Sequence, residues 1–219
     1  MRNLFSQTNF DRAIIASLTD KEFIKIHEEL KKVEHAYFDN EKGFICTLPY
    51  EKIVQMVSKE RREGIMKVAE HLNPKFICAE LQSTSKEDAI KELAGLIKDC
   101  REINDFDQFL KDVFEREEMM STGIGDTIAV PHARTDAVNK LIIAMGRSHA
   151  GVDFKSIDKK PVNLIFLLGT PAKEMGDYLR ILSYLTRVLM KEDFRQRLLD
   201  ANGPEEIIEI FANKENHTS

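Results

Sequence analysis

The residues with the clearest chemical potential lie between positions 121 and 134, in the segment STGIGDTIAVPHAR. Two glycines, Gly123 and Gly125, precede a short apolar run that ends in a proline and His132. Glycine backbones can turn successive N–H groups outward together, and such concave arrangements bind anions. A neutral imidazole can act as a nucleophile or a base. The segment could therefore place a reactive histidine beside an anion-binding loop.

Three chemistries could use His132, and its neighbourhood favours one of them. A metal site would need further His, Cys or carboxylate ligands at a suitable spacing, and no such set converges on this segment. Hydrolysis would need a nearby nucleophile, but Ser121 lies eleven residues away and has no nucleophile-elbow motif. Phosphoryl transfer needs only a free imidazole lone pair and donors for the phosphoryl oxygens. From spacing alone, a histidine satisfied by its own backbone at a strand end is equally open.

The remaining histidines have a less suggestive setting. Three of them lie in the polar, helical first third and are interpreted as surface residues: His27, His35 and His71. His217 lies in the terminal tail, and His149 precedes Ala-Gly in a predicted turn.

Residues 75–219 alternate between strand and helix patterns and must position the histidine. Apolar side chains at helical spacing predict helices after Ser83–Ser85, from Phe106 and from Tyr178, and two more close the chain. Short apolar runs predict strands at 75–81, 127–130, 141–145 and 162–168. The run VNLIFLL is continuous, as expected of a strand covered on both faces. The pattern predicts an α/β (α+β) domain, a mixed β-sheet flanked by helices on both faces.

Residues 1–74 are predicted to form a separate helical N-terminal segment. A capping-box sequence at Thr19–Glu22 precedes an apolar stripe spaced three and four residues apart. A turn signal follows at Asp39–Gly43, and Pro49 can open a second helix that extends to Leu72. Asn73-Pro74 marks the predicted boundary. The members of the stripe are Phe23, Ile26, Leu30, Val33 and Tyr37.

Composition excludes several classes of protein. The net charge is −5 over 219 residues, which argues against nucleic-acid binding through bulk positive charge. No apolar run approaches the length of a membrane span, and no signal peptide is evident. The three cysteines, Cys46, Cys78 and Cys100, are widely spaced and form no CxxC pair. We therefore expect reduced thiols in a cytoplasmic protein, without a metal or another cofactor.

The sequence resembles the enzyme IIA domains of the phosphoenolpyruvate:sugar phosphotransferase system, of the fructose/mannitol class that includes the nitrogen-regulatory enzyme IIA. STGIG followed by IAVPH resembles the active-site segment of that family. The run FEREEMMSTG resembles the family's helix ending in Arg-Glu before the loop, and later strands and helices also correspond. The resemblance covers residues 76–212. Within the family, the sequence is most similar to the nitrogen-regulatory type.

The resemblance implies that the protein is a histidine phosphotransferase. His132 would accept a phosphoryl group from the phosphocarrier HPr, or its nitrogen-type homologue, and pass it to an enzyme IIB or hold it as a signal to a regulated target. Arg116, Thr122, Gly123 and Gly125 match family positions that assist the phosphate. The glycines and threonine could equally serve only a turn and its cap, and Arg116 could be an ordinary surface arginine.

Two features depart from or extend beyond the family pattern. Many members carry a second histidine at the head of the third helix, where this chain has Tyr178. Its hydroxyl can donate one hydrogen bond to a phosphoryl oxygen but carries no positive charge near neutral pH. Core packing explains Tyr178 equally well.

The stripe in residues 1–74 needs a partner surface, and we expect a homodimer formed through this segment. A non-catalytic interaction module that retains the fold is the alternative function.

Overall fold

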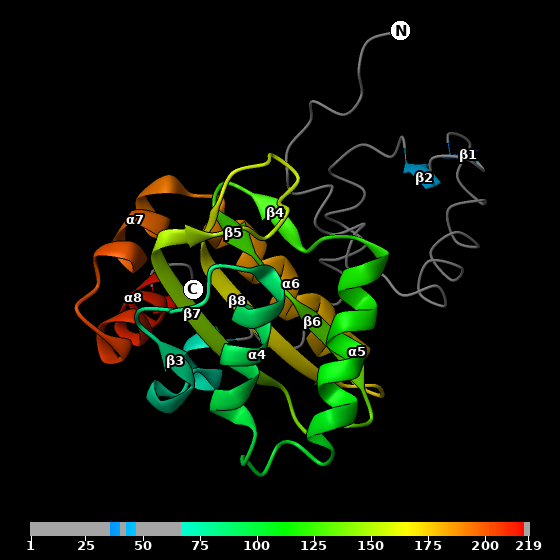
Figure 1. The fold of residues 1–219 in the computed structure, drawn as a ribbon, viewed down its shortest axis with the longest axis horizontal. Coiled ribbons are helices and arrows are strands. Elements are labelled where there is room, and N and C mark those ends of the chain that lie inside the picture. Colours follow the sequence, from blue (N-terminus) through cyan, green and yellow to red (C-terminus); the bar gives the residue numbers. More distant parts are fainter. Residues whose placement is uncertain (1–35, 40–42, 47–66, 217–219) are drawn as a thin grey trace, which may run out of the picture. The chain divides into compact units, whose positions relative to one another are not determined.

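The computed structural model describes residues 36–39, 43–46 and 67–216 (Figure 1). Strands β1 (Ala36–Asp39) and β2 (Gly43–Cys46) form an antiparallel hairpin in one compact unit, whereas residues 67–216 belong to another. The prediction that Tyr37 continues a helix is wrong, because Tyr37 pairs with Ile45 across this hairpin. The turn signal that follows favours a hairpin over a helix at this point. The rest of the predicted N-terminal helices, up to residue 66, lies outside the described residues.

A six-stranded mixed sheet forms the centre of the larger unit. Its strand order is β3-β7-β8-β5-β4, and β6 also pairs with β8. The pairs β3/β7, β5/β8 and β6/β8 are parallel, whereas β7/β8 and β4/β5 are antiparallel. The strands are β3 (Ile77–Cys78), β4 (Gly123–Gly125), β5 (Ile128–Ala129), β6 (His132–Thr135), β7 (Ile142–Val152) and β8 (Val162–Pro171).

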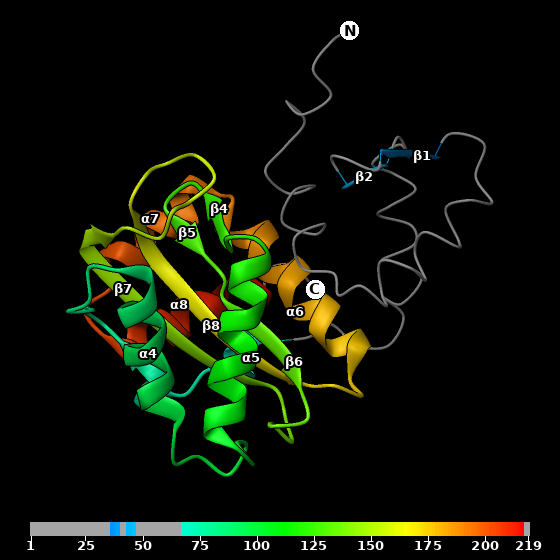
Figure 2. The same ribbon diagram turned by 45° about the vertical axis from the view of Figure 1, so that its right-hand side comes forward.

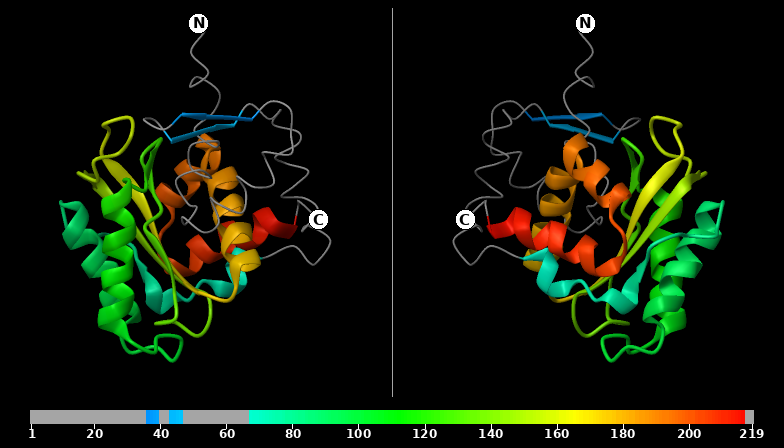
Figure 3. Two further views of the ribbon diagram at one scale, coloured as in Figure 1. Left: turned by 90° about the vertical axis from the view of Figure 1, so that its right-hand side faces the viewer. Right: turned by 90° about the vertical axis from the view of Figure 1, so that its left-hand side faces the viewer.

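Helices cover both faces of this sheet, as predicted. Figure 3 shows α4 and α5 on one side of the strands and α6, α7 and α8 on the other. Short 3-10 turns, η3 (Val68–His71) and η4 (Pro74–Phe76), precede β3. The helices are α4 (Lys86–Ile97), α5 (Phe106–Met119), α6 (Met175–Leu189), α7 (Glu192–Asp200) and α8 (Pro204–Asn216).

Helix α4 illustrates how local sequence specifies these elements. Ser85 is its N-cap, and the serine hydroxyl accepts a hydrogen bond from the Asp88 N–H at 3.2 Å. This bond satisfies one of the N–H groups that the first turn of a helix leaves unpaired. The predicted apolar stripe is confirmed, because its four members are all buried in the core: Ile90, Leu93, Ala94 and Ile97.

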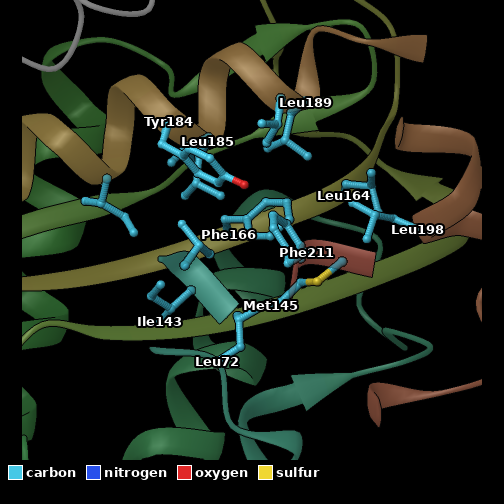
Figure 4. Close-up of a cluster of buried hydrophobic side chains, with 14 of the residues drawn as sticks. Leu72, Ile143, Met145, Leu164, Phe166, Tyr184, Leu185, Leu189, Leu198 and Phe211 are labelled. Atoms are coloured by element: carbon cyan, nitrogen blue, oxygen red, sulfur yellow. The ribbon is translucent and has the colours of Figure 1, made fainter. Parts of the chain in front are cut away.

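The side chains of β8 alternate between two hydrophobic cores. Leu164, Phe166 and Leu168 pack toward α6, α7 and α8, whereas Ile165 and Leu167 pack toward α4 and α5. Figure 4 shows Leu164 and Phe166 in the first of these cores. Successive side chains of a strand point to opposite faces, so a strand between two helical layers is apolar throughout. This confirms the prediction for the VNLIFLL run.

The core begins before the predicted boundary at Asn73-Pro74. Val68 and Leu72 are buried in the core beneath α6, α7 and α8. The buried carboxylate of Glu215 in α8 accepts a hydrogen bond from the Val68 N–H at 2.7 Å. Residues 67–74 therefore pack with the sheet, and the role of residues 1–74 as a separate segment stays a prediction.

Two local predictions need correction. His149 was expected in a turn, but it lies within β7, because pairs with β8 on either side of it, Arg147 with Leu164 and Val152 with Val162, continue the strand through an irregular stretch. Gly123 and Gly125 were expected in a loop, but they form β4, which pairs with β5. In both cases cross-strand pairing decides the conformation, and pairing is not visible in local composition.

Candidate functional site

His132 is the first residue of β6, and its ring faces the α6 side of the sheet. Strand β6 pairs with β8, the one strand it pairs with in the described part of the chain, and His132 lies opposite Leu168. The imidazole packs against Tyr178 of α6, with ring centroids 5.6 Å apart and the ring planes at 58°. Helix α5 runs alongside β6 (Figure 2) and brings Arg116, in its last turn, to the same region. The sheet edge and two helix ends thus meet at this histidine.

A hydrogen bond to the main chain orients the imidazole. Nδ1 of His132 lies 2.7 Å from the carbonyl oxygen of Val130. Because a carbonyl oxygen can only accept, Nδ1 carries the hydrogen and, in the neutral ring, Nε2 carries the lone pair. Nε2 is buried and has no hydrogen-bond partner within residues 67–216. The nitrogen with the available lone pair is therefore the one that the protein leaves unbonded.

The surroundings also keep this ring neutral. Burial, and to a smaller extent the positive charge of Arg116, lower the pKa of His132 from 6.5 to about 3, while the hydrogen bond to Val130 acts in the opposite direction. Burial penalises the charged imidazolium because it removes water from the charge. At neutral pH the Nε2 lone pair is consequently not occupied by a proton.

His132 is buried, although it lies at the end of a strand. The residue is only 4% exposed. The bond from Nδ1 to the Val130 carbonyl turns the ring along its own strand, and Tyr178 packs against the ring. A strand end is exposed only when nothing covers the adjoining face of the sheet. Here α6, the helix predicted from Tyr178 onward, covers that face.

Arg116 is not an ordinary surface arginine. Its Nη1 donates a hydrogen bond to the carbonyl oxygen of Met120 at 3.0 Å, which fixes one end of the guanidinium. Its Nε and Nη2 are buried and have no hydrogen-bond partner among the described residues. Burial lowers the arginine pKa, and interactions with Tyr178 and Glu117 oppose that effect. Buried donors without partners are costly, and an anion in this space would satisfy them.

Tyr178 is both a core residue and a neighbour of the site, so geometry supports each of its two interpretations. Its side chain is 1% exposed within the core formed with α6, and its ring lies against His132. Its charge interaction with Arg116 places it near the guanidinium as well. Tyr178, at the position that resembles the family's second histidine, therefore lies near both His132 and Arg116.

The two glycines are explained by close packing. The N–H groups of Gly123 and Gly125 donate to the hydroxyls of Ser121 and Ser156 at 3.3 and 3.2 Å, so both are engaged within the protein. A Cβ atom on Gly123 would lie 2.8 Å from the Cα of Ser156, and Gly125 has a φ of 94°. Both values require glycine.

The register also separates Gly125 from the histidine. Gly125 lies opposite Ile128, which pairs with Leu164, four positions along β8 from the Leu168 partner of His132. Four residues of strand correspond to about 13 Å. The structure therefore does not bring the Gly125 amide to the imidazole.

Thr122 connects the site to a buried charge pair that the sequence analysis did not identify. The Thr122 hydroxyl donates to the Glu117 carboxylate at 2.5 Å, and the Thr122 N–H lies 3.0 Å from the same group. Lys86 of α4 donates to Glu117 at 3.1 Å. The sequence signal was the Arg-Glu pair at 116–117, of which only the arginine was assigned a role.

The described residues also limit other readings of the site. Within them, no group of three or more His, Cys, Asp or Glu side chains could hold a metal ion. In the same part of the chain, no helix combines the length and apolar character that crossing a membrane requires.

Comparisons with known proteins agree with this arrangement. The family model "Phosphoenolpyruvate-dependent sugar phosphotransferase system, EIIA 2" matches residues 70–214. The fructose-specific EIIA component of Haloferax volcanii is 41% identical over 137 residues, covering 63% of this chain and 89% of the relative. The fructose-specific EIIABC component of Bacillus subtilis is 37% identical over 67% of this chain, which spans only 23% of that longer relative.

A solved structure gives the same picture for the fold. The crystal structure of the nitrogen regulatory protein IIA-Ntr from Neisseria meningitidis superposes with a TM-score of 0.62 at 29% identity. The match covers 66% of this chain and 98% of the other.

Proposed function

The chain belongs to the EIIA type 2 family of the phosphoenolpyruvate-dependent sugar phosphotransferase system, and on that premise we propose that Nε2 of His132 is its phosphoryl acceptor. A phosphocarrier role follows from the family itself. The assignment to His132 rests on the hydrogen bonding of its imidazole. Nδ1 donates to the Val130 carbonyl oxygen, and Nε2 has no hydrogen-bond partner within residues 67–216.

The proposed transfer needs no proton movement. The Nε2 lone pair forms a nitrogen–phosphorus bond while the corresponding bond in a donor phosphohistidine breaks and leaves its electron pair on the donor ring. Nδ1 of His132 keeps its hydrogen, so the phosphorylated ring gains the positive charge that the donor ring loses. The Val130 carbonyl, 2.7 Å from Nδ1, stabilises this charge as it develops.

Arg116 and Tyr178 are the side chains proposed to hold the phosphoryl oxygens. The Nε and Nη2 atoms of Arg116 are buried donors without partners in the described structure, and guanidinium geometry suits bidentate binding of phosphate. The Tyr178 hydroxyl can supply one neutral donor. Thr122, Gly123 and Gly125 have their donors engaged within the protein, so we assign them to positioning β4 and the segment that leads from it to His132.

The partners follow from this role. A phosphohistidine carrier of the HPr type, or its nitrogen-type homologue, is the proposed donor, and an enzyme IIB or a regulated target protein is the proposed acceptor. The name of the Bacillus relative includes A, B and C components in one chain, which favours transfer to an EIIB component. Identity of 41% to a fructose-specific component, against 29% to a nitrogen regulatory protein of Pseudomonas aeruginosa, favours a sugar-linked role. These partners place the proposed activity in the cytoplasm.

One observation favours the alternative of a non-catalytic interaction module. His132 is 4% exposed and covered by a tyrosine, so a donor protein can reach Nε2 only if the neighbouring side chains move. In the phosphocarrier reading, docking of the donor displaces Tyr178. In the alternative, the covered histidine never reacts and the fold binds a partner by its surface.

The test uses the full chain with radiolabelled phosphoenolpyruvate, enzyme I and HPr. We expect an acid-labile, alkali-stable adduct on the wild-type chain and no label on a folded His132→Ala variant. His71→Ala is the matched control, because it removes a histidine that lies in η3. Label retained in His132→Ala would overturn the assignment, and no label on the wild type with several phosphocarriers would favour the interaction module.

A further inference from the structure

Glu117 carries a buried carboxylate, and core stability alone does not explain why a charged group is buried at this position. Glu117 lies in the last turn of α5, directly after Arg116, and is 5% exposed. A buried carboxylate is costly unless it is paired and fully hydrogen-bonded. Here it accepts bonds from the Thr122 N–H and hydroxyl and from the Lys86 ammonium.

Lys86 is held as firmly as its partner. The side chain of Lys86 is 11% exposed, and its ammonium lies 5.7 Å from the ring centroid of Phe154. Helix α4 therefore fixes the ammonium, the ammonium helps to fix the Glu117 carboxylate, and the carboxylate fixes Thr122. The pair joins two helices to the segment that enters β4.

This cluster leads to the imidazole through two further hydrogen bonds. The Thr122 carbonyl accepts the Val130 N–H at 3.0 Å. The Val130 carbonyl accepts the Nδ1 hydrogen of His132 at 2.7 Å. The same peptide segment that Glu117 anchors thus determines where the acceptor for Nδ1 lies.

We propose that Glu117, held by Lys86, is a positioning residue for His132, because it fixes the Thr122–Val130 pairing whose carbonyl keeps the hydrogen on Nδ1 and the lone pair on Nε2. If the carboxylate is lost, Val130 is free to shift and the imidazole can adopt the other tautomer, in which Nε2 carries the hydrogen and cannot attack. The consequence for catalysis rests on the proposed function, whereas the consequence for the tautomer does not.

The first experiment measures the tautomer directly. Nitrogen-15 NMR of the full chain, labelled at histidine, distinguishes protonated from unprotonated ring nitrogens of His132. We expect the wild type to hold the hydrogen on Nδ1 almost completely, and Glu117→Gln to show a mixture of tautomers. Glu118→Gln makes the same charge change at the exposed neighbouring residue and should retain the wild-type spectrum. An unchanged tautomer in folded Glu117→Gln would overturn the proposal.

The second experiment measures the rate of phosphorylation by phospho-HPr. We expect Glu117→Gln to slow it roughly 10- to 100-fold, as loss of a group that orients a catalytic ligand commonly does. Thr122→Val, which removes the hydroxyl at constant volume, should slow it as well, and Thr122→Ser should restore it. Equal rates for the valine and serine variants would count against the proposal.

These two readouts separate failure of the inference from failure of the proposed function. If the wild-type chain accepts no phosphate, the proposed function fails while the tautomer of His132 still tests the role of Glu117. If Glu117→Gln does not fold, the valine and serine variants of Thr122 decide by both measurements.

Discussion

The buried, neutral His132 should make the folded chain lose stability as the pH falls below neutral. The unfolded histidine has a pKa near 6.5, whereas burial and Arg116 lower the folded pKa to about 3. Below pH 6.5 the unfolded chain therefore binds a proton that the folded chain excludes, and protonation favours unfolding. The contribution is fully present above pH 6.5 and is lost as the pH falls toward 3.

The size of the effect follows from the two pKa values. Integrating the linkage relation from pH 7 to pH 5 gives a loss of about 2 kcal/mol from this residue, and the whole shift corresponds to about 5 kcal/mol. Because domains of this size are stable by only about 5–15 kcal/mol, the loss is readily measurable. A histidine whose pKa is the same in the folded and the unfolded chain would contribute nothing to this pH dependence of stability.

The measurement is urea unfolding of the full chain at pH 7 and pH 5, for wild type and for His132→Gln. Other titrating groups, such as Glu215, act in both proteins and cancel in the comparison. We expect the wild type to lose about 2 kcal/mol more than the variant between the two pH values. The reasoning is refuted if both proteins lose the same free energy, or if the NMR signal of His132 titrates near pH 6.5.

The remaining predictions concern the phosphoryl site, its loop and the N-terminal segment. Tyr178→Phe should lower the yield or lifetime of phosphohistidine with little change in stability, and unchanged kinetics would leave Tyr178 as a core residue only. Arg116→Ala should slow phosphorylation at least about tenfold, since charged donors to phosphoryl oxygens contribute strongly to transfer, and an unchanged rate in stopped-flow transfer would contradict this. Gly123→Ala should cost roughly 1–3 kcal/mol in urea unfolding, because its new methyl group would lie 2.8 Å from the Cα of Ser156, and a neutral effect would show that the loop yields freely. In sedimentation the full chain should be a dimer and a chain beginning at Lys67 a monomer that still accepts phosphate, and two monomers would end the dimer proposal.

Much of the secondary structure could be read from the sequence because it depends on local spacing. The stripe from Ile90 to Ile97 predicts α4, and the continuous run at 162–168 predicts a strand buried on both faces. Helical and strand periodicities arise within one element, so a single sequence reveals them. The conformation at Tyr37 was missed because hairpin pairing overrides a helical spacing that continues for only one more residue.

The glycines show the limit of reasoning from a motif. Their presence correctly indicated an unusual backbone, but the anion-binding role assumed that their N–H groups are free. In the fold these groups donate to Ser121 and Ser156, and Ser156 lies more than thirty positions along the chain. A contact between such distant segments depends on strand pairing and leaves no local signal.

By itself the sequence determined which residues could do chemistry: a histidine after an apolar run, an arginine ahead of it and a tyrosine on a later helix. Only the tertiary structure decided their states. It buries His132, places the hydrogen on Nδ1 through the Val130 carbonyl, and leaves Arg116 donors without partners in the described residues. It also ties Glu117 to the histidine through Thr122. Residue types and spacings are properties of the chain, whereas burial, tautomer and unsatisfied donors depend on which distant segments fold against each other.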